Sequence, residues 1–409
     1  MKILLIVIDG LGDRPIPQLG NKTPLEAAKT PNLDFLAKKG ICGLVLPYLQ
    51  NKKPPTSEDT HLALFSYDPK IYNPGRGVLE VMGIGMEILA GDVCLRGNFA
   101  TVDEKIKIID RRAGRIEETT DLIRAIGGIE IEGVKFLIGK SISHRIGIVM
   151  RPCLDSVLSL GARVVDLSPK ISDSDPKITQ VRPVQITALD SSKEAKFTAR
   201  ILNQFLAKAH SILKDHPLNK KREKQGLLPA NYILVREAGT FKEISSFEQK
   251  YGLKSCCIAG GSLYKGLGKY LGMDLIEVKG ATGLPDTNLR GKFLAAKRAM
   301  PKCDFIYCHI KAPDNLAEDG NFRGKRDFIK EIDKKITALM NLKNVLLVIT
   351  ADHSTCSLFK RHCAQAIPIL IYGDGVNGIK KFSEKACKSG KLGKIKQLDL
   401  MPKILELAQ

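Results

Sequence analysis

The chain has 409 residues, of which 44% are hydrophobic. This length is too great for one small domain and predicts two domains with a large buried core. No apolar run approaches the roughly 20 residues that a membrane-spanning helix needs, so we predict no membrane partner.

The formal net charge of +20 would attract an anionic partner, either nucleic acid or a phosphorylated metabolite. The basic residues are spread along the whole chain and do not form one cluster. This distribution favours a generally lysine-rich surface over a binding site for a specific anionic partner. No basic cluster alternates with aromatic residues and the chain has no Trp, so a platform for stacked bases is not expected. We therefore rank a nucleic-acid-binding protein below an enzyme of small anionic metabolites.

The first apolar run, residues 3–8, is followed at once by Asp9 and has no small-residue cleavage site. It therefore predicts a buried strand and not a signal peptide. The ten cysteines are scattered and include no C-x-x-C pair of the kind that zinc sites and redox motifs use. We expect free thiols in a reducing cytoplasm.

Further apolar runs alternate with helical patterns, which is typical of an α/β fold. The clearest helix begins near Ser192, keeps its apolar residues on one face through Leu213 and is stopped by Pro217. A second helix is expected over residues 327–340, and the last is capped by Asp399. The predicted core strands are residues 3–8, 232–235, 255–259, 305–309, 345–349 and 367–371.

Residues 103–188 have a different texture, because short strand-like pieces alternate there with charged turns. These pieces are residues 106–109, 134–138 and 145–150. We predict an inserted second domain over 103–188, with a discontinuous core domain made of residues 1–102 and 189–409.

Polar residues follow several of the predicted strands. Asp9, Asp314 and the pair Asp352-His353 each come shortly after an apolar run, and His362 lies shortly before the last one. In open α/β sheets, sites form beyond the carboxyl ends of the strands, and carboxylate and imidazole groups are good ligands for divalent metals. Each residue alone reads more commonly as a helix cap or turn former, but together they predict a two-metal site.

Ser57 is a candidate nucleophile. It follows a rigid Pro54-Pro55 turn and precedes a predicted helix, whose free backbone N–H groups would suit a phosphoryl group. A metal bound to its oxygen would lower the pKa of the hydroxyl. Taken alone, a serine at this position is more commonly a helix cap.

The chain resembles the cofactor-independent phosphoglycerate mutases of the archaeal type, in the alkaline phosphatase superfamily. The resemblance runs in order through nearly the whole chain. The segments that carry it are residues 9–15, 22–32, 61–65, 91–93, 98–102, 110–116, 144–145, 172–176, 280–283, 319–322, 352–355 and 399–402.

The resemblance implies an α/β fold with an alkaline-phosphatase-like metal-binding core sheet flanked by helices and an inserted smaller α/β domain. It implies a cytoplasmic isomerase of glycolysis and gluconeogenesis, active as a monomer or small homo-oligomer. The implied reaction interconverts 3-phosphoglycerate and 2-phosphoglycerate through a phosphoserine, with the glycerate trapped between the domains. The implied cofactors are two divalent ions, manganese or magnesium, with cobalt or zinc as alternatives.

Carried over by motif, Ser57 and Lys265 match the catalytic residues, and Lys265 supports the phosphoryl group. The implied ligands of one metal are Asp9, Ser57, Asp352 and His353. Those of the other are Asp314 and His362, with Glu318 as a candidate at the position of a third ligand. The implied substrate-binding residues are Arg111, Arg112, His144, Arg145, Asp173, Asp175 and Arg236.

Several positions depart from the family pattern, and Glu318 and Thr56 are the two that bear most on the site. Glu318 stands where a histidine is usual, which adds a negative charge and should favour harder ions such as manganese or magnesium. Thr56 replaces a glycine beside the nucleophile, where the backbone is expected to approach closely. A metal-dependent phosphatase or phosphotransferase acting on another phosphometabolite therefore stays open as the alternative.

Overall fold

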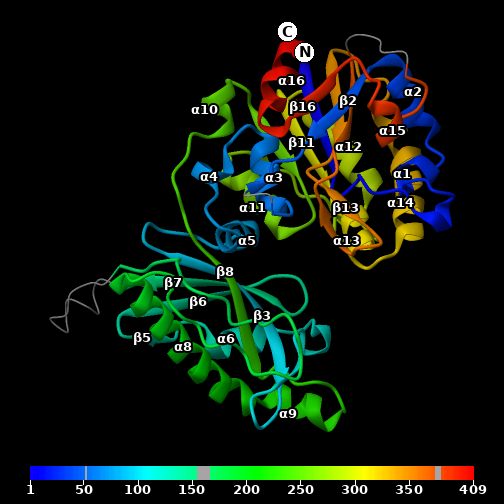
Figure 1. The fold of residues 1–409 in the computed structure, drawn as a ribbon. Coiled ribbons are helices and arrows are strands. Elements are labelled where there is room, and N and C mark those ends of the chain that lie inside the picture. Colours follow the sequence, from blue (N-terminus) through cyan, green and yellow to red (C-terminus); the bar gives the residue numbers. More distant parts are fainter. Residues whose placement is uncertain (51–52, 154–165, 374–378) are drawn as a thin grey trace. The chain divides into compact units, whose positions relative to one another are not determined.

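The chain folds into two compact units in the computed structural model, which describes residues 1–50, 53–153, 166–373 and 379–409. The first unit comprises Met1–Asn73 and Ile244–Gln409, and the second, Pro74–Glu243, is inserted between its halves (Figure 1). The predicted α/β fold with an inserted domain is confirmed. The insert is wider than the predicted 103–188, because strands on either side of that segment pair with each other inside the second unit.

An eight-stranded sheet forms the centre of the first unit, in the order β10-β9-β11-β1-β12-β15-β2-β16. The strands from β10 to β12 run parallel, and β15 runs antiparallel to both of its neighbours. The strands are β1 (Lys2–Ile8), β2 (Ile41–Leu46), β9 (Ser255–Ile258), β10 (Asp274–Leu275), β11 (Phe305–Ile310), β12 (Val345–Thr350), β15 (Ile367–Tyr372) and β16 (Gly393–Lys396). A separate hairpin pairs β13 (Ser354–Cys356) with β14 (Arg361–Cys363).

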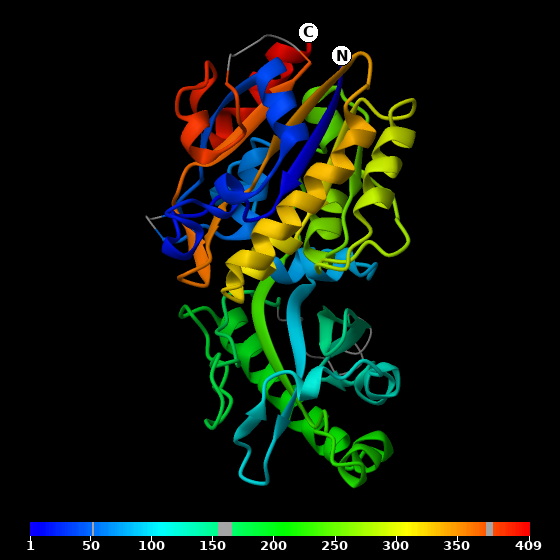
Figure 2. The same ribbon diagram turned by 90° about the vertical axis from the view of Figure 1, so that its right-hand side faces the viewer.

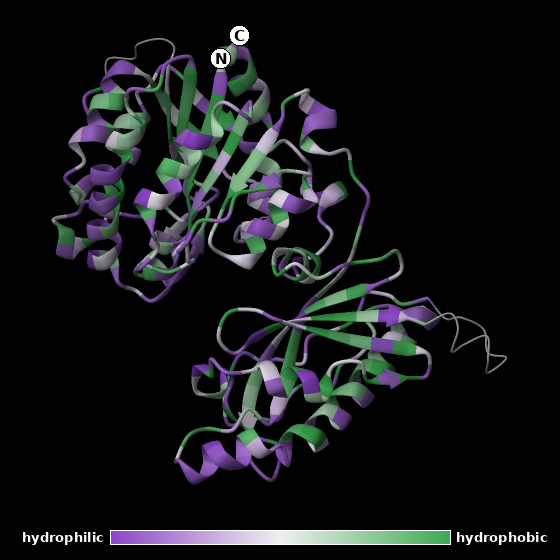
Figure 3. Cartoon of the chain, turned by 180° about the vertical axis from the view of Figure 1, so that it is seen from behind, coloured by the Kyte–Doolittle hydropathy of each residue, from purple (hydrophilic) through white to green (hydrophobic). Residues whose placement is uncertain are grey.

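Helices cover both faces of this sheet, so that its central strands are buried and apolar, as expected for a parallel sheet (Figure 3). In Figures 1 and 2, α12 and α14 lie on one face and α3 and α11 on the other. The helices are α1 (Pro24–Ala27), α2 (Pro31–Lys39), α3 (Ser57–Leu64), α4 (Pro69–Tyr72), α10 (Phe247–Tyr251), α11 (Ser262–Tyr270), α12 (Leu289–Ala299), α13 (Ala312–Glu318), α14 (Phe322–Ile336), α15 (Glu384–Cys387) and α16 (Leu400–Ala408).

The second unit is built on a six-stranded sheet in which β3 pairs antiparallel with both β7 and β8. Its strands are β3 (Val93–Val102), β4 (Ile108–Asp110), β5 (Glu130–Ile131), β6 (Val134–Lys140), β7 (Arg145–Pro152) and β8 (Tyr232–Thr240). Its helices are α5 (Arg76–Gly83), α6 (Thr120–Ile126), α8 (Lys193–Lys214) and α9 (Pro217–Lys224).

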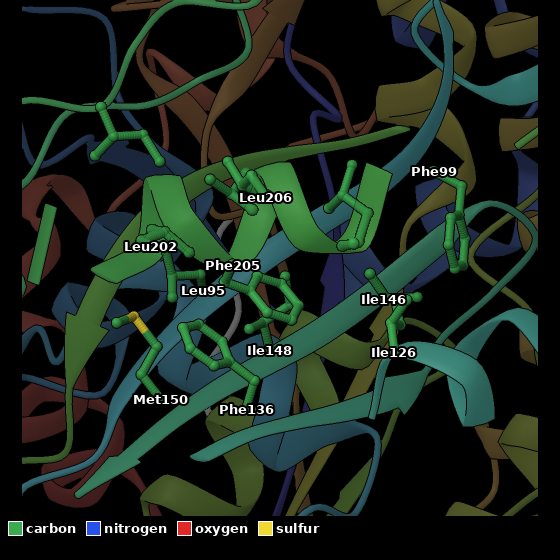
Figure 4. Packing of buried hydrophobic residues seen from close by; sticks show 14 of the residues in the cluster. Leu95, Phe99, Ile126, Phe136, Ile146, Ile148, Met150, Leu202, Phe205 and Leu206 are labelled. Carbon is green, nitrogen blue, oxygen red and sulfur yellow. The ribbon is translucent and has the colours of Figure 1, made fainter. Parts of the chain in front are cut away.

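The long helix α8 packs its apolar face on this sheet (Figure 4). The predicted apolar face is confirmed, and the rings of Phe136 and Phe205 stack on it with centroids 4.0 Å apart. All of its predicted apolar residues are buried, namely Ala195, Ala199, Leu202, Phe205, Leu206, Ala209 and Leu213. The Ser192 hydroxyl caps the helix by accepting a hydrogen bond from the backbone N–H of Ala195.

The expectation that all ten cysteines are free is wrong at one pair. Cys356 and Cys363 form a disulfide across the hairpin of β13 and β14, which brings their Cα atoms within 6.0 Å. The other eight cysteines are free, and most are buried. Within the described part of the chain, no helix is both long and apolar enough to cross a membrane.

Candidate functional site

Three neighbouring parallel strands end at the same edge of the first unit's sheet. β1 lies between β11 and β12, with Val7 in register with both His309 and Thr350. Asp9 directly follows β1, Asp314 lies on α13 just after β11, and the Asp352-His353 pair follows β12. These four side chains are fully buried and lie together, as the positions of the strands in the sequence predict.

Two groups of potential metal ligands form at this edge. Asp9, Asp352 and His353 make one, and Asp314, His353 and His362 make the other, with one ligand atom of each residue within 4.8 Å of the others. His353 Nε2 lies 3.1 Å from Asp352 Oδ2 and 3.5 Å from Asp9 Oδ1. The prediction placed His353 in one ligand set, whereas the geometry places it in both groups.

The residues of these groups fit a divalent cation. Among the described residues, Asp9 Oδ1 and Asp352 Oδ2 are buried oxygens with no hydrogen-bond partner. Buried carboxylates are costly unless a cation compensates them, and a set of carboxylate oxygens and imidazole nitrogens suits manganese, magnesium or zinc. Burial, together with the charge of Asp9, raises the pKa of Asp352 well above its usual range. The ionised carboxylate is therefore destabilised here, and a bound cation would offset that destabilisation.

The second oxygen of Asp9 is surrounded by donors. Asp9 Oδ2 accepts a hydrogen bond from the Tyr264 hydroxyl, lies 3.0 Å from His309 Nε2 and is 3.3 Å from Lys311 Nζ. Burial alone would raise the pKa of Asp9, but Lys311 and the two nearby histidines hold it well below the usual range. With Oδ2 held in this way, Oδ1 is the oxygen left for a metal.

Lys311 is a site residue that the sequence reasoning did not assign. Its ammonium also donates to Asp314 Oδ2, so it contacts one carboxylate from each ligand group. By contrast, the ammonium of the predicted catalytic Lys265 is held by the Glu277 carboxylate, at 2.8 and 2.6 Å. The signal available in the sequence was the position of Lys311 directly after the strand that precedes Asp314.

Ser57 is the first residue of α3, and its Oγ lies 3.3 Å from His353 Nε2. Thr56 is the helix cap, since its side chain accepts a hydrogen bond from the Asp59 N–H. Its φ of −101° and ψ of 152° are ordinary extended values, so the backbone here does not require a glycine. His61 supports the same turn by donating from Nδ1 to the Ser57 carbonyl at 2.7 Å.

Glu318 lies beside the second ligand group and not within it. It is the last residue of α13, its side chain is half exposed, and its Oε1 is 3.7 Å from His362 Nε2. His362 is oriented by a hydrogen bond of 2.7 Å between its Nδ1 and the Pro55 carbonyl. This contact ties the hairpin that carries His362 to the turn before Ser57.

The predicted substrate residues all lie in the second unit, where several form one charged cluster. Arg111 binds Asp175 through two hydrogen bonds of 2.8 Å, and Arg236 Nε lies 3.5 Å from the same carboxylate. Asp173 accepts a hydrogen bond from the backbone N–H of Glu237. The two arginines therefore share one buried carboxylate, and Asp173 is hydrogen-bonded to β8 at Glu237, the residue next to Arg236.

Four further members of this cluster were not predicted from the sequence, because they lie inside helices and strands: Arg76, Glu80, Arg96 and Glu237. Arg96 on β3 stands directly opposite Arg236 on β8, and two like charges in this arrangement destabilise the sheet. Glu237 lies 3.4 Å from both Arg96 Nη1 and Arg76 Nε, and Glu80 also pairs with both arginines.

Two of the predicted substrate residues feel this positive charge strongly. Burial, followed by the charges of Arg145 and its neighbours, lowers the pKa of His144 to about 3, so this histidine is neutral near pH 7. Burial and Arg96 lower the pKa of Arg145 to about 10. A cluster with this excess of positive charge is suited to bind an anion.

Comparisons with known proteins agree with this picture. A profile of the metalloenzyme superfamily matches residues 1–407. The 2,3-bisphosphoglycerate-independent phosphoglycerate mutase 1 of Archaeoglobus fulgidus is 42% identical, covering 100% of this chain and 98% of the relative. That of Methanocaldococcus jannaschii is 41% identical over 99% of this chain and 97% of its own length. Among solved structures, the cofactor-independent phosphoglycerate mutase of Thermoplasma acidophilum is 36% identical, with full coverage of both chains and a TM-score of 0.69.

Proposed function

Because the chain belongs to the metalloenzyme superfamily and, within it, to the 2,3-bisphosphoglycerate-independent phosphoglycerate mutases, we propose that it interconverts 3-phosphoglycerate and 2-phosphoglycerate through a phosphoserine at Ser57. The observation that carries this proposal is the position of Ser57. Its Oγ lies at the start of α3 and 3.3 Å from His353 Nε2, the imidazole that belongs to both ligand groups. A nucleophile at this position meets both the helix N-terminus and the proposed metal ligands.

We propose two metal sites that share His353. Asp9 and Asp352 hold the first, and Asp314 and His362 hold the second, with Glu318 close enough to His362 to contribute from the side. When bound, divalent ions would supply positive charge that lowers the pKa of the Ser57 hydroxyl and offsets the charge of the phosphoryl oxygens.

The proposed reaction is two phosphoryl transfers. The Ser57 oxygen attacks the phosphorus of 3-phosphoglycerate, and the bond between phosphorus and the C3 oxygen breaks, which leaves phosphoserine and glycerate. The C2 hydroxyl of the same glycerate then attacks the phosphoserine, and Ser57 recovers its hydroxyl. The sum is an isomerisation that consumes neither water nor a bisphosphate cofactor.

Lys311 is the residue that we propose for stabilising the transferring phosphoryl group, in place of Lys265. Its ammonium already lies between carboxylates of the two ligand groups, whereas that of Lys265 is engaged by Glu277. A fixed cation at this position counters the charge that builds up on the phosphoryl oxygens during transfer.

The arginine cluster of the second unit is the part that we propose for binding the anionic substrate. Arg145 and Arg236 carry planar guanidinium groups that bind carboxylate and phosphate in bidentate fashion. Glu80 and Glu237 pair with Arg96, and Asp175 pairs with Arg236. These ion pairs offset part of the repulsion between the arginines of the cluster.

A coupled assay tests the proposal. The full chain is incubated with 3-phosphoglycerate and each of manganese, magnesium, cobalt and zinc, and the product is detected with enolase. We expect conversion without added 2,3-bisphosphoglycerate. Failure with every metal would contradict the proposal, and release of free phosphate faster than isomerisation would point to a phosphatase.

A further inference from the structure

Lys325, on α14, is a fully buried lysine whose three donor positions are all used. Its Nζ donates to the Gly12 carbonyl at 3.1 Å, to Asp13 Oδ2 at 3.0 Å and to the Thr355 carbonyl at 2.9 Å. A buried ammonium is tolerated only when it is paired and fully hydrogen-bonded, as here. The mechanism proposed above makes no use of it.

The three acceptors belong to the two segments that carry proposed metal ligands. Gly12 and Asp13 follow Asp9 by three and four residues, and Thr355 follows His353 by two. The segments also touch directly, since the Thr355 N–H donates to the Gly12 carbonyl at 3.0 Å. Lys325 therefore joins the backbone after one ligand to the backbone after the other.

A second set of contacts extends this junction on both sides. Ser357 donates to Asp13 from its N–H and from its hydroxyl, the latter at 2.6 Å. Thr355 points its hydroxyl toward the metal edge, where Oγ1 donates to Asp314 Oδ1 and lies 3.2 Å from His353 Nδ1. A shift of the Thr355 backbone would therefore move groups that touch both proposed metal sites.

We infer that Lys325 is a positioning residue that sets the separation between the Asp9 segment and the Asp352–Thr355 segment, and thereby the affinity of the site for divalent metal. This inference rests on the proposed metal sites, although none of the three groups to which Lys325 donates is the side chain of a proposed ligand. Residues in the outer shell of a metal site act in this way, and their loss typically weakens metal binding by about 10- to 100-fold.

Asp333 provides a matched control on the same helix. It is also buried and charged, and it accepts hydrogen bonds from the Leu33 N–H at 2.8 Å and from the Asn32 side chain at 3.1 Å. These contacts anchor α14 to the start of α2 and touch neither ligand segment. An effect of Lys325 that came only from looser docking of α14 would appear in Asp333→Asn as well.

The test is a calorimetric titration of the full chain with Mn²⁺, well below the unfolding temperature, for the wild type, Lys325→Met and Asp333→Asn. We expect the Kd for Mn²⁺ to rise about 10- to 100-fold in Lys325→Met and to stay within about threefold in Asp333→Asn. Equal affinity of Lys325→Met and wild type, or an equal loss in both variants, would overturn this inference alone. Absence of Mn²⁺ binding by the wild type would overturn the proposed metal sites along with it.

A double variant keeps the test valid if Lys325→Met fails to fold. Lys325→Met leaves Asp13 as a buried charge without its cation, whereas Lys325→Met with Asp13→Asn removes both charges together. Circular dichroism checks that the double variant is folded. We expect the same loss of Mn²⁺ affinity, because the Gly12 and Thr355 carbonyls still lack their shared donor, and wild-type affinity in the folded double variant would overturn the inference.

Discussion

The strand edge of the first unit gathers buried carboxylates and imidazoles, whereas the sheet of the second unit gathers arginines. At the strand edge, the acidic groups Asp9, Asp314 and Asp352 face one lysine, and two of their oxygens have no hydrogen-bond partner among the described residues. In the second unit, Arg96 and Arg236 stand opposite each other on paired strands.

The two regions differ in what each lacks. The strand edge has an excess of buried negative charge and needs cations, and the arginine cluster has an excess of positive charge and needs an anion. We expect the first region to control the chemical step and the second to control substrate binding. Both leave charge uncompensated where a ligand is proposed, at a cost in stability of the folded protein.

Ser57→Ala is the change with the largest expected effect. It removes the proposed nucleophile, and loss of a nucleophile from a group of residues that act together lowers kcat by about 10³-fold or more. The side chain loses one contact, that with His353, so the free energy of unfolding should hardly change. Steady-state kinetics and thermal melting measure the two quantities, and retention of a tenth of wild-type kcat would contradict the assignment.

Lys311→Met is expected to lower kcat by about 10²- to 10³-fold, the usual cost of removing one group that stabilises charge in the transition state. Lys265→Met is the paired variant, because it makes the same substitution at a second lysine. Lys265 lies on α11, and its ammonium is bound by Glu277. We expect its loss of kcat to be at least about tenfold smaller. The reverse order would restore Lys265 as the lysine that supports the phosphoryl group.

Arg145→Gln should act on binding and not on chemistry. Loss of one charged hydrogen-bonding group costs about 1.5–3 kcal/mol, which is a rise of roughly 10- to 100-fold in KM for phosphoglycerate. Arg145 is crowded by other arginines, which together with burial lower its pKa. The same variant should therefore be as stable as the wild type or more so in thermal melting, and a large loss of stability with unchanged KM would show that Arg145 is structural.

The two units should also respond to pH in opposite directions, through one buried group in each. In the second unit, burial and arginine charge hold the pKa of His144 at about 3, below its unfolded value of 6.5. The unfolded chain therefore binds the extra proton first, and stability is lost as the pH falls from 6.5 toward 3. In the first unit, burial raises the pKa of Glu384 from 4.5 in the unfolded chain to about 7. The unfolded chain therefore loses this proton first, and the folded protein loses stability as the pH rises from 4.5 to 7.

Denaturant unfolding of His144→Gln and Glu384→Gln between pH 4.5 and 8 measures both effects. Relative to wild type, His144→Gln should gain stability toward pH 4.5 and Glu384→Gln toward pH 8, each by about 3 kcal/mol, from about 1.4 kcal/mol per pKa unit. Parallel pH profiles for the wild type and both variants would contradict the assigned shifts.

The strand edge was largely predictable from the sequence. Asp9, Asp314 and Asp352 each follow an apolar run, and parallel strands end at one edge of a sheet, so their meeting follows from the order of elements. The sharing of His353 between two ligand groups depends on its rotamer and on the stacked ring of His362, with centroids 3.7 Å apart. The sequence contains no pattern that fixes either.

The arginine cluster was less predictable, because strand pairing and not chain order brings its members together. Arg96 and Glu237 meet only because β3 and β8 pair across more than a hundred residues, with a shift of register at Arg96. The bond between Cys356 and Cys363 escaped prediction for the same kind of reason, since it depends on the hairpin of β13 and β14. The position of Lys311 directly after β11 could have identified it from the sequence. The role of supporting the phosphoryl group was predicted for Lys265 instead, because Lys265 matches a family motif.

The most direct test of the account is the chemical state of Ser57 during turnover. The wild-type chain would be mixed with 3-phosphoglycerate and Mn²⁺, quenched with acid within the first turnovers, digested and analysed by mass spectrometry. We predict phosphate on the peptide that contains Ser57, at Ser57 itself, and none in Ser57→Ala. An enzyme that forms 2-phosphoglycerate while Ser57 never carries phosphate would contradict the account.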